Sequence, residues 1–369
     1  MIREVLSRLA AVLCAAALFF LCGSVIPASL AGEEPAPEPE TSVSEPAEPT
    51  EPAEPADPEP EETAGPEYFS LVMVGDCTLD GLEYQAVVGD DYAYPFSGTR
   101  SYFDGVDFTM ANLECALTTE VSTSSKNFVF RAPPAYASIM VEGGIDFVTL
   151  GNNHVLDCGE QGYADTKKAL DDVGVAYAGR DEWTVYTTEN GLKIGVYALS
   201  FGTEAQIRAG IAALQDAGAD FIIAALHWGD EGSYHANKTQ TAQAHAAIDA
   251  GADFVYGSHP HTLQPMEEYE GHYIFYSMGN WTFGGNTNPR DKDTILLQMT
   301  VRRDPDGTVS VDGYEIVPCA CSGEANGNDY CPVPYEKDSE AWKRTLSKLD
   351  GTFDGKDLNI SYQYTFSEY

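Results

Sequence analysis

The stretch VTLGNNHVLDCG, from Val148 to Gly159, contains the pattern that decides the fold. Its first half is an apolar, β-branched run typical of a buried strand, and Gly151 then permits a sharp exit. Asn152, Asn153 and His154 follow at once, although polar side chains are costly to bury without partners. A turn explains the glycine and one asparagine, but it explains the histidine less well. The question is whether other strands of this chain end in the same way.

Apolar runs of strand length recur along the chain, and helical stretches lie between them. Five such runs cover residues 69–76, 106–114, 145–154, 220–230 and 252–261. The stretches 163–174 and 241–252 are typical of helices, each closed by a glycine. Three runs begin with a small residue and an aspartate before a phenylalanine, which indicates repeated helix-to-strand connections. The alternation predicts an α/β domain. Later strands are expected in HYIFYSMGN (272–280), DTILLQMTV (293–301) and TVSVDGYEIV (308–317).

Polar side chains follow all five of these runs. In open α/β sheets, ligands bind in the crevice outside the carboxyl ends of the strands, so parallel pairing would bring the five tips together. Carboxylates, carboxamides and imidazoles together are ligands for borderline divalent metals. The sequence therefore predicts a metal site at this edge. Its candidate residues are Asp76, Asn112, Glu114, Asn152, Asn153, His154, His227, His259 and His261.

Each polar residue after a strand also has a simpler structural explanation when it is considered alone. Asp76 would cap a turn, Glu114 would pair with Arg131, and the two asparagines would form a turn. His259 and His261 are harder to explain in this way, because their i, i+2 spacing places both imidazoles on one side of an extended segment. The remaining histidines are expected to be structural or solvated: His235, His245 and His272.

The N-terminus, residues 1–31, has the pattern of a signal peptide or a membrane anchor. Arg3 and Arg8 precede an uncharged stretch whose first part is almost wholly apolar. The small residues Ser29 and Ala31 suit signal cleavage, but residues 9–31 also approach the ~20 needed to span a bilayer, so both interpretations stay open. Cys22 lacks the small residue expected just before a lipidated cysteine. In either case we expect the body of the protein to lie outside the cytoplasm.

Residues 32–67 form a linker rich in glutamate, proline and alanine. The tract contains 13 acidic residues, 10 prolines and no basic residue. Such a chain buries too little apolar surface to fold, and it is predicted to be disordered and extended. It would act as a stalk or as a simple spacer. No break in composition follows it, so residues 68–369 are predicted to form one domain.

The charge of the chain excludes some classes of partner. Of the formal net charge of −38, −26 belongs to residues 68–369. A domain this acidic argues against nucleic acid or an anionic membrane surface as the main partner. An anionic polymer would need metal ions or local basic residues to offset the field.

The cysteines do not indicate a thiolate metal site. Six of the eight remain if Cys14 and Cys22 leave with a signal peptide, and no CxxC pair occurs. A disulfide among the three late cysteines stays open, and its pairing cannot be read from the sequence: Cys319, Cys321 and Cys331.

Seven segments form an ordered set of motifs: VGDCTLDG, ANLECALTT, FRAPP, GNNHVLDCGEQG, HWGDEGSY, GADFVYGSHPHTLQPMEEYEG and YSMGNWTFG. This set resembles the CapA family of poly-γ-glutamate capsule synthesis proteins, which is related to the calcineurin-like metallophosphoesterases. The resemblance covers about residues 68–317, and GNNH, HWG, HPH and YSMGN are its most specific parts. It implies a four-layer α/β/β/α sandwich of the metallo-dependent phosphatase type.

The resemblance also implies roles for the polar residues that follow the predicted strands. His154 takes the position of the catalytic histidine, and Asp157 is expected to orient it. Thr78 stands where the metallophosphoesterase pattern has a metal-binding histidine, so one metal position loses an imidazole. One or two divalent ions are therefore expected, with Mn, Fe or Zn as candidates. The implied metal ligands are Asp76, Glu114, Asn153, His227, His259 and His261.

For function, the resemblance implies an extracytoplasmic protein that makes, anchors or releases poly-γ-glutamate or a similar anionic cell-envelope polymer, alongside membrane components of capsule synthesis. Asn112, Lys126 and Arg131 are predicted to contact the anionic substrate. A metal-dependent hydrolase or transferase, acting at a phosphoester or an amide bond, is the main hypothesis. A non-catalytic, polymer-binding accessory protein and a secreted phosphoesterase of small substrates are the alternatives.

Overall fold

A computed structural model describes residues 65–122 and 126–358. The predicted signal or anchor (1–31) lies outside the described residues, and so does the predicted linker except for its last three residues. Of these three, Glu67 already belongs to the first strand, where it pairs with Arg303. No helix within the described ranges is long and apolar enough to cross a membrane.

The larger sheet has eight strands, and it has a parallel part and an antiparallel part. Strands β1, β2, β5 and β6 pair in parallel, whereas β14, β15 and β16 continue the sheet antiparallel on the other side of β1. A short strand, β13, pairs with the end of β1. The bounds are β1 Glu67–Thr78, β2 Phe108–Leu113, β5 Phe147–Thr149, β6 Ala176–Ala178, β13 Asn280–Phe283, β14 Asp293–Arg303, β15 Val309–Ala320 and β16 Val333–Pro334.

The second sheet has six strands in the order β11-β12-β10-β9-β8-β7. Its central strands β8, β9, β10 and β12 are parallel, and the two edge strands are antiparallel. The expected strand HYIFYSMGN is in fact divided: its first half is β12 of this sheet, and its last residue begins β13 of the other sheet. The bounds are β7 Glu182–Thr187, β8 Lys193–Ser200, β9 Phe221–His227, β10 Phe254–Ser258, β11 Met266–Tyr269 and β12 His272–Phe275.

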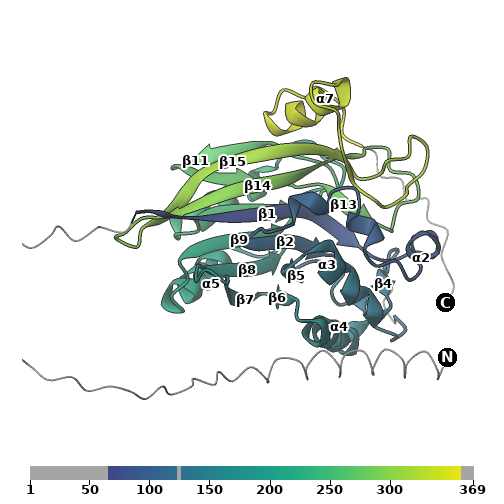
Figure 1. Cartoon of the computed structure of the whole chain (residues 1–369), viewed down its shortest axis with the longest axis horizontal. Helices are drawn as coiled ribbons and strands as arrows, with labels where there is room; N and C mark the ends of the chain where they lie inside the picture. Colours follow the sequence, from purple (N-terminus) through teal and green to yellow (C-terminus); the bar gives the residue numbers. More distant parts are fainter. Residues whose placement is uncertain (1–64, 123–125, 359–369) are drawn as a thin grey trace, which may run out of the picture. The chain divides into compact units, whose positions relative to one another are not determined.

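The side chains of the strands alternate between two cores, which defines four layers. In β9, Phe221 and Ile223 pack into the core between the sheets, while Ile222 and Ala224 pack outward under helices. Helices α3 (Ala137–Gly143) and α4 (Gly159–Val173) cover the outer face of the larger sheet. Helices α5 (Glu204–Asp216) and α6 (Lys238–Asp249) cover the outer face of the smaller one. The predicted α/β/β/α sandwich is therefore confirmed (Figure 1).

Smaller elements complete the fold. Helix α7 packs against β14 and β15, at the yellow end of the chain in Figure 1. The remaining elements are β3 Ala116–Leu117, β4 Arg131–Ala132, α2 Leu82–Val88, α7 Glu340–Leu349 and the 3-10 helices η1 Tyr94–Phe96, η2 Arg100–Tyr102 and η3 Pro134–Tyr136.

The repeated aspartates before the strands have a common function in the fold. Asp146, Asp220 and Asp253 each accept a hydrogen bond from a backbone N–H of the neighbouring strand, at 2.9, 2.9 and 2.7 Å. Each carboxylate thus satisfies a donor that would otherwise be left unpaired at the sheet end. This fixes the register of the parallel strands, and therefore the position of the tips that follow them.

Candidate metal centre

The carboxyl ends of the parallel strands in both sheets meet at one edge of the sandwich. The larger sheet contributes the ends of β1, β2 and β5, and the smaller sheet contributes the ends of β9 and β10. The backbone N–H of His259, which follows β10, donates to Asp76 Oδ2 of β1 at 3.2 Å. This bond joins the two sheets at the predicted site.

Asp76 is placed by an irregularity near the end of β1. The pairing of β1 with β2 and with β13 shifts register at this residue, and such bulges re-aim a side chain. A Cβ at Gly75 would meet the carbonyl oxygen of Gly279 at 1.9 Å, so only glycine lets the two backbones approach. That carbonyl accepts the N–H of Asp76 at 2.9 Å. The buried carboxylate is held by Asn112 Nδ2, 2.9 Å from its Oδ1.

Glu114 is fully buried directly after β2, yet neither of its carboxylate oxygens accepts a hydrogen bond from the described residues. Its Oε1 lies 3.4 Å from His227 Nε2 and 3.9 Å from His261 Nε2. These distances are too long for good hydrogen bonds but short enough for a shared cation. An isolated buried carboxylate is costly unless it is paired or coordinates a metal. The carboxylate of Glu114 is therefore placed to bind a cation.

His227 and Asn153 point at each other across the two sheets. His227 Nδ1 lies 2.8 Å from Ser258 Oγ, which fixes the ring. Its other nitrogen, Nε2, lies 2.8 Å from Asn153 Oδ1 and 3.1 Å from His259 Nδ1. Three atoms that can each ligate a metal thus converge on one point.

His259 and His261 are not in an extended segment, so that part of the prediction is wrong. Their φ angles are +96° and +57°, in the left-handed half of conformational space that non-glycine residues seldom enter. The two rings nevertheless lie on one side, with centroids 5.8 Å apart, because the turn reverses around Pro260. Such strain persists only where surrounding contacts enforce it.

The electrostatics of these two histidines differ sharply. Burial, reinforced by the neighbouring imidazoles of His227, His261 and His154, holds the pKa of His259 well below its usual value. Burial also acts to lower the pKa of His261, but the carboxylates of Glu114 and Asp76 outweigh it and raise that pKa to about 10. His259 is thus neutral and ready to ligate. His261 attracts positive charge, whether a proton or a metal ion.

The donor atoms form two overlapping groups that fit divalent metal. Within each group, one ligand atom per residue lies within 4.8 Å of the others. The groups share Glu114, so its carboxylate would help to hold an ion in either group. The chemistry of the set, with carboxylates, imidazoles and an unpaired buried acid, fits the predicted cofactor. The groups are Asp76, Glu114 and His227, and Glu114, His259 and His261.

His154 lies beside this cluster and is held by Asp157, as predicted. Its Nδ1 is 2.6 Å from Asp157 Oδ2, and its ring packs on Phe130 with centroids 4.2 Å apart. Asp157 also accepts the N–H of Phe130 at 2.8 Å and the ammonium of Lys126 at 2.7 Å. Lys126 donates in addition to the carbonyl oxygen of Asn153. The lysine predicted to bind substrate is thus beside the catalytic candidate, bonded to its orienting acid.

Asn112 is enclosed by other residues of the site, and its predicted contact with substrate stays a prediction. It is fully buried, and its carboxamide bonds Asp76, Thr149 (2.9 Å) and Asn152 (3.2 Å). It therefore helps to position Asp76, because its Nδ2 donates to the carboxylate while its Oδ1 accepts two other hydrogen bonds. Asn152 does more than turn the chain: its Nδ2 donates to the carbonyl oxygen of Leu113 at 2.8 Å, which ties the loop to β2.

Two positioning residues were missed by sequence reasoning. Asn280 Oδ1 lies 2.9 Å from His261 Nδ1, and Ser258 Oγ orients His227. Asn280 ends the motif YSMGN, so its place in a quoted motif was the available signal. Ser258 is the last residue of β10 and gave no signal of its own, since serine at a strand end is common.

Thr78 and Arg131 have local partners. Thr78 is buried, and its hydroxyl lies 3.2 Å from the carbonyl oxygen of Glu114, so it supports the backbone that carries this candidate ligand. Arg131 opens β4, and its Nη1 donates to the carbonyl oxygen of Glu120 at 2.9 Å. Its predicted contact with substrate stays a prediction.

The remaining histidines and the cysteines are structural in position. His245 stacks on Tyr269, with centroids 3.8 Å apart, and lies 2.9 Å from Glu267; His272 Nδ1 contacts the carbonyl oxygen of Asp253. All six cysteines in the described ranges are buried free thiols. The disulfide left open among the last three is not formed: Cys319 bonds the carbonyl oxygen of Val317, and Cys331 contacts Ser97.

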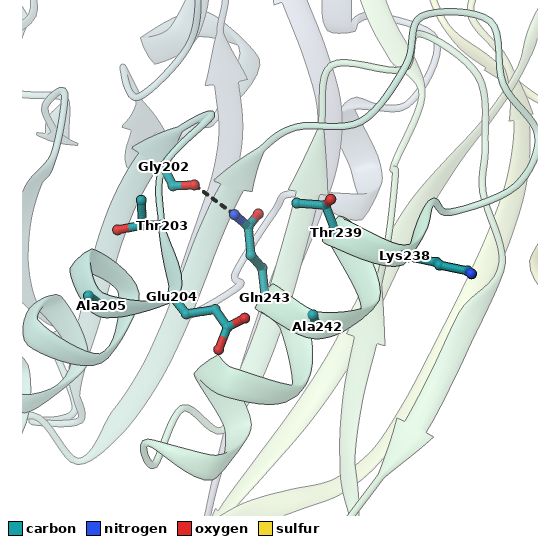
Figure 2. Close-up of a pocket in the computed structure, with 8 residues that line it drawn as sticks. All are labelled: Gly202, Thr203, Glu204, Ala205, Lys238, Thr239, Ala242 and Gln243. Carbon is teal, nitrogen blue, oxygen red and sulfur yellow. Dashed lines mark hydrogen bonds between the residues drawn. The ribbon is translucent and has the colours of Figure 1, made fainter.

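A shallow hollow of about 510 Å³ begins beside the site. Phe201, half exposed and in a left-handed conformation, places its ring edge-on to His259 with centroids 4.8 Å apart. The next residue, Gly202, already lines the hollow, where its carbonyl oxygen accepts Gln243 Nε2 at 2.7 Å (Figure 2). The first turns of α5 and α6 form the walls, including Lys238. The hollow therefore begins one residue along the chain from Phe201, the aromatic neighbour of His259.

Comparison with known proteins identifies two relatives whose names refer to capsule or PGA biosynthesis. The capsule biosynthesis protein CapA of Bacillus anthracis is 30% identical over 282 residues, which are 67% of this chain and 66% of that protein. The PGA biosynthesis protein CapA of Bacillus subtilis (strain 168) is 27% identical over 327 residues, 82% of each chain. This chain therefore spans slightly under two thirds of the first relative and most of the second.

A solved structure of similar arrangement is the 5′-nucleotidase of Candida albicans SC5314. The identity is 13%, the match covers 77% of this chain and 56% of that chain, and the TM-score is 0.42. The family profile described as bacterial capsule synthesis protein PGA_cap matches residues 70–285, which include every candidate metal ligand. The chain belongs to this family of bacterial capsule synthesis proteins.

Proposed function

We propose that this protein is a metal-dependent hydrolase or transferase that acts on an anionic capsular polymer of the poly-γ-glutamate type, outside the cytoplasm. The observation that supports the proposal best is Glu114, a buried carboxylate that accepts no hydrogen bond from the described residues. It belongs to both groups of candidate metal ligands and lies beside a histidine–aspartate pair. The named relatives act in capsule or PGA biosynthesis, which supports the substrate class. The N-terminal pattern supports the location.

A divalent ion held by these residues would polarise an oxygen of the substrate and lower the pKa of water. Asn153 would bind through its side-chain oxygen, its only acceptor, which already points at His227. A metal would also offset the acidity of the domain, because the substrate and the protein are both anionic.

His154 is proposed to transfer a proton to the leaving group. With Nδ1 bonded to Asp157, the opposite ring nitrogen, Nε2, is left to face substrate. Protonated there, it donates to the departing oxygen or nitrogen, and the carboxylate of Asp157 stabilises the positive ring. Lys126 keeps Asp157 in place from the other side. The same arrangement serves a phosphoester or an amide, so the bond cleaved has to be found by assay.

The test is a set of four full-length proteins: wild type, His154→Ala, His259→Ala/His261→Ala, and the control His245→Ala. Metal content, hydrolysis of γ-linked oligoglutamate and of an aryl phosphodiester, and capsule on complemented cells are measured. We expect the double variant to lose metal, His154→Ala to keep metal but lose turnover and capsule, and the control to match wild type. A wild-type protein without metal, or a fully active His154→Ala, would refute the proposal.

A polymer-binding accessory role is the second candidate, favoured by the hollow that begins beside Phe201. In that case the wild type would bind oligoglutamate without cleaving it, and His154→Ala would leave capsule intact. Turnover of the aryl phosphodiester alone would instead favour a phosphoesterase of small substrates. The location is tested separately, by protease treatment of intact cells.

A further inference from the structure

The C-terminal segment beyond the family match carries a buried lysine that has no part in the proposed chemistry. Lys348 of α7 is 2% exposed, and its ammonium lies 2.6 Å from Asp291 Oδ2 and 2.6 Å from Asp293 Oδ2. Arg344 of the same helix bonds both oxygens of Asp293, at 2.7 and 2.6 Å. Leu346 and Leu349 pack against the core between the sheets. Helix α7 is therefore firmly attached to the sandwich.

This helix is joined to the loop that follows the metal ligand His227. Tyr234 lies in this loop, and its hydroxyl donates to Asp291 Oδ2 at 2.8 Å. Its ring packs edge-on against Phe353, with centroids 4.8 Å apart, and the Lys348 ammonium lies 5.0 Å from the ring centre.

Backbone bonds add to these side-chain contacts. The N–H of Tyr234 donates to Asp357 Oδ1, and the N–H of Leu358 donates to the carbonyl oxygen of Gly232, each at 2.9 Å. The loop is thus fastened to the C-terminal segment through side chains and through its own backbone.

The same loop contacts the turn that carries two candidate ligands. The N–H of Gly232 donates to the carbonyl oxygen of Pro260 at 2.7 Å, between His259 and His261. The hydroxyl of Thr262, one residue further on, donates to the carbonyl oxygen of Ser233 at 2.8 Å. A continuous set of direct contacts therefore runs from α7, through the loop, to the left-handed turn.

We infer that residues 335–358 are a brace that holds the His259–Pro260–His261 turn in its left-handed conformation, and that Tyr234 is the positioning residue through which the brace acts on the metal ligands. Two histidines with positive φ on either side of a proline need outside contacts to persist. The sheets supply one contact, Asp76 to the N–H of His259, and the braced loop supplies the bond at Pro260. The consequence for metal binding rests on the proposed function.

The experiment compares full-length wild type with Tyr234→Phe, Lys348→Met and the control Lys343→Met, whose ion pair lies on the exposed face of α7. Tyr234→Phe keeps the ring against Phe353 and removes only the hydroxyl. Cobalt(II) affinity and visible absorption spectrum, with hydrogen exchange of residues 230–236 and 258–264, are measured on each protein.

We expect Tyr234→Phe to fold normally, to bind cobalt roughly 2- to 30-fold more weakly with an altered spectrum, and to exchange faster in both segments. Lys348→Met should show the same changes more strongly, and Lys343→Met none. Unchanged exchange in residues 258–264 of a folded Tyr234→Phe would overturn the brace. If wild type binds no metal, the proposed function fails, while hydrogen exchange still decides this inference.

Discussion

Among the described residues, the acids bonded by α7 and the acids at the strand tips differ in what neutralises them. At α7, the carboxylate of Asp293 accepts hydrogen bonds from Lys348, Arg344 and the hydroxyl of Tyr335. Side chains of the protein therefore compensate its negative charge. At the strand tips, Glu114 is equally buried, and neither oxygen accepts a hydrogen bond from the described residues.

The contrast shows how to separate a structural acid from a ligand acid. A carboxylate can be buried when hydrogen bonds and opposite charges compensate for the hydration that it loses. Where a buried acid accepts no hydrogen bond from the described residues, as at Glu114, a bound cation compensates for the lost hydration in addition to the neighbouring His261, whose pKa the acid raises. The two clusters should therefore respond in opposite ways when one charge is removed.

The largest effect is expected at the fully paired cluster. Lys348→Met leaves the buried Asp293 and the partly buried Asp291 with one cation fewer, and we expect the free energy of unfolding to fall by about 3–5 kcal/mol. Urea unfolding of the full chain measures it, with Lys343→Met as the exposed control on the same helix. A fall in the free energy of unfolding of less than about 1 kcal/mol would mean that Lys348 does not compensate the two aspartates. The contrast between this cluster and Glu114 would then be wrong.

The metal cluster should give the reverse result for stability. Glu114→Gln removes a buried charge without removing a hydrogen bond, so in the presence of a chelator the variant should be at least as stable as wild type. Its metal affinity should fall by more than the roughly 10- to 100-fold typical of a lost outer partner. Thermal unfolding with chelator and metal titration measure the two effects. A variant that is less stable with chelator would show that Glu114 is a structural acid.

The sequence was sufficient for the features that depend on local patterns. The five runs and the polar residues after them follow from local apolar patterning, and parallel pairing then brings Asp76, Glu114, Asn153 and His227 together. The HPH turn was misjudged for a physical reason. A residue before proline favours extended backbone, and that preference is overridden here by contacts from Asp76 and Gly232, which are distant in sequence.

The α7 cluster could not be predicted at all. Nothing near Lys348 in the sequence indicates that an amphipathic helix buries its lysine against Asp291 and Asp293, since lysines on helices are usually solvated. Asn280 was likewise visible only as part of a motif, because its bond to His261 depends on the chain crossing between sheets. Partners far apart in sequence are the part that requires the structure.

A smaller effect is expected at Asp157. This acid is neutralised by a side chain of the protein, and it also contacts a residue of the candidate site. It is paired with Lys126 and also serves His154. Asp157→Asn keeps an acceptor but removes the charge that stabilises the imidazolium, so turnover should fall about 10- to 100-fold while metal content stays unchanged. Turnover of whichever substrate wild type accepts, with ¹⁵N NMR of the His154 ring, measures this. Loss of metal in this variant would place Asp157 among the ligands instead.

The smallest effect on stability is expected for a substitution of Arg344. Its dependence on pH tests how the Asp293 carboxylate is neutralised. Burial acts to raise the pKa of Asp293, but Arg344 and Lys348 outweigh it, so that pKa lies below its ordinary value. A lowered carboxyl pKa contributes stability that is present above the unfolded pKa of about 3.9 and is lost as the pH falls through the folded pKa. Arg344 is half exposed, so water screens its charge, and Arg344→Met should cost only about 1 kcal/mol at pH 7.

That cost should shrink as the pH falls below about 4, because protonated Asp293 no longer attracts the guanidinium. Urea unfolding at pH 7 and pH 3 tests this, with Arg208→Met as control, since its partner Asp249 is 3.8 Å away and equally exposed. The control should show almost no difference at either pH. A cost for Arg344→Met that is the same at both values would mean that the guanidinium acts by packing, and that Lys348 alone neutralises the cluster.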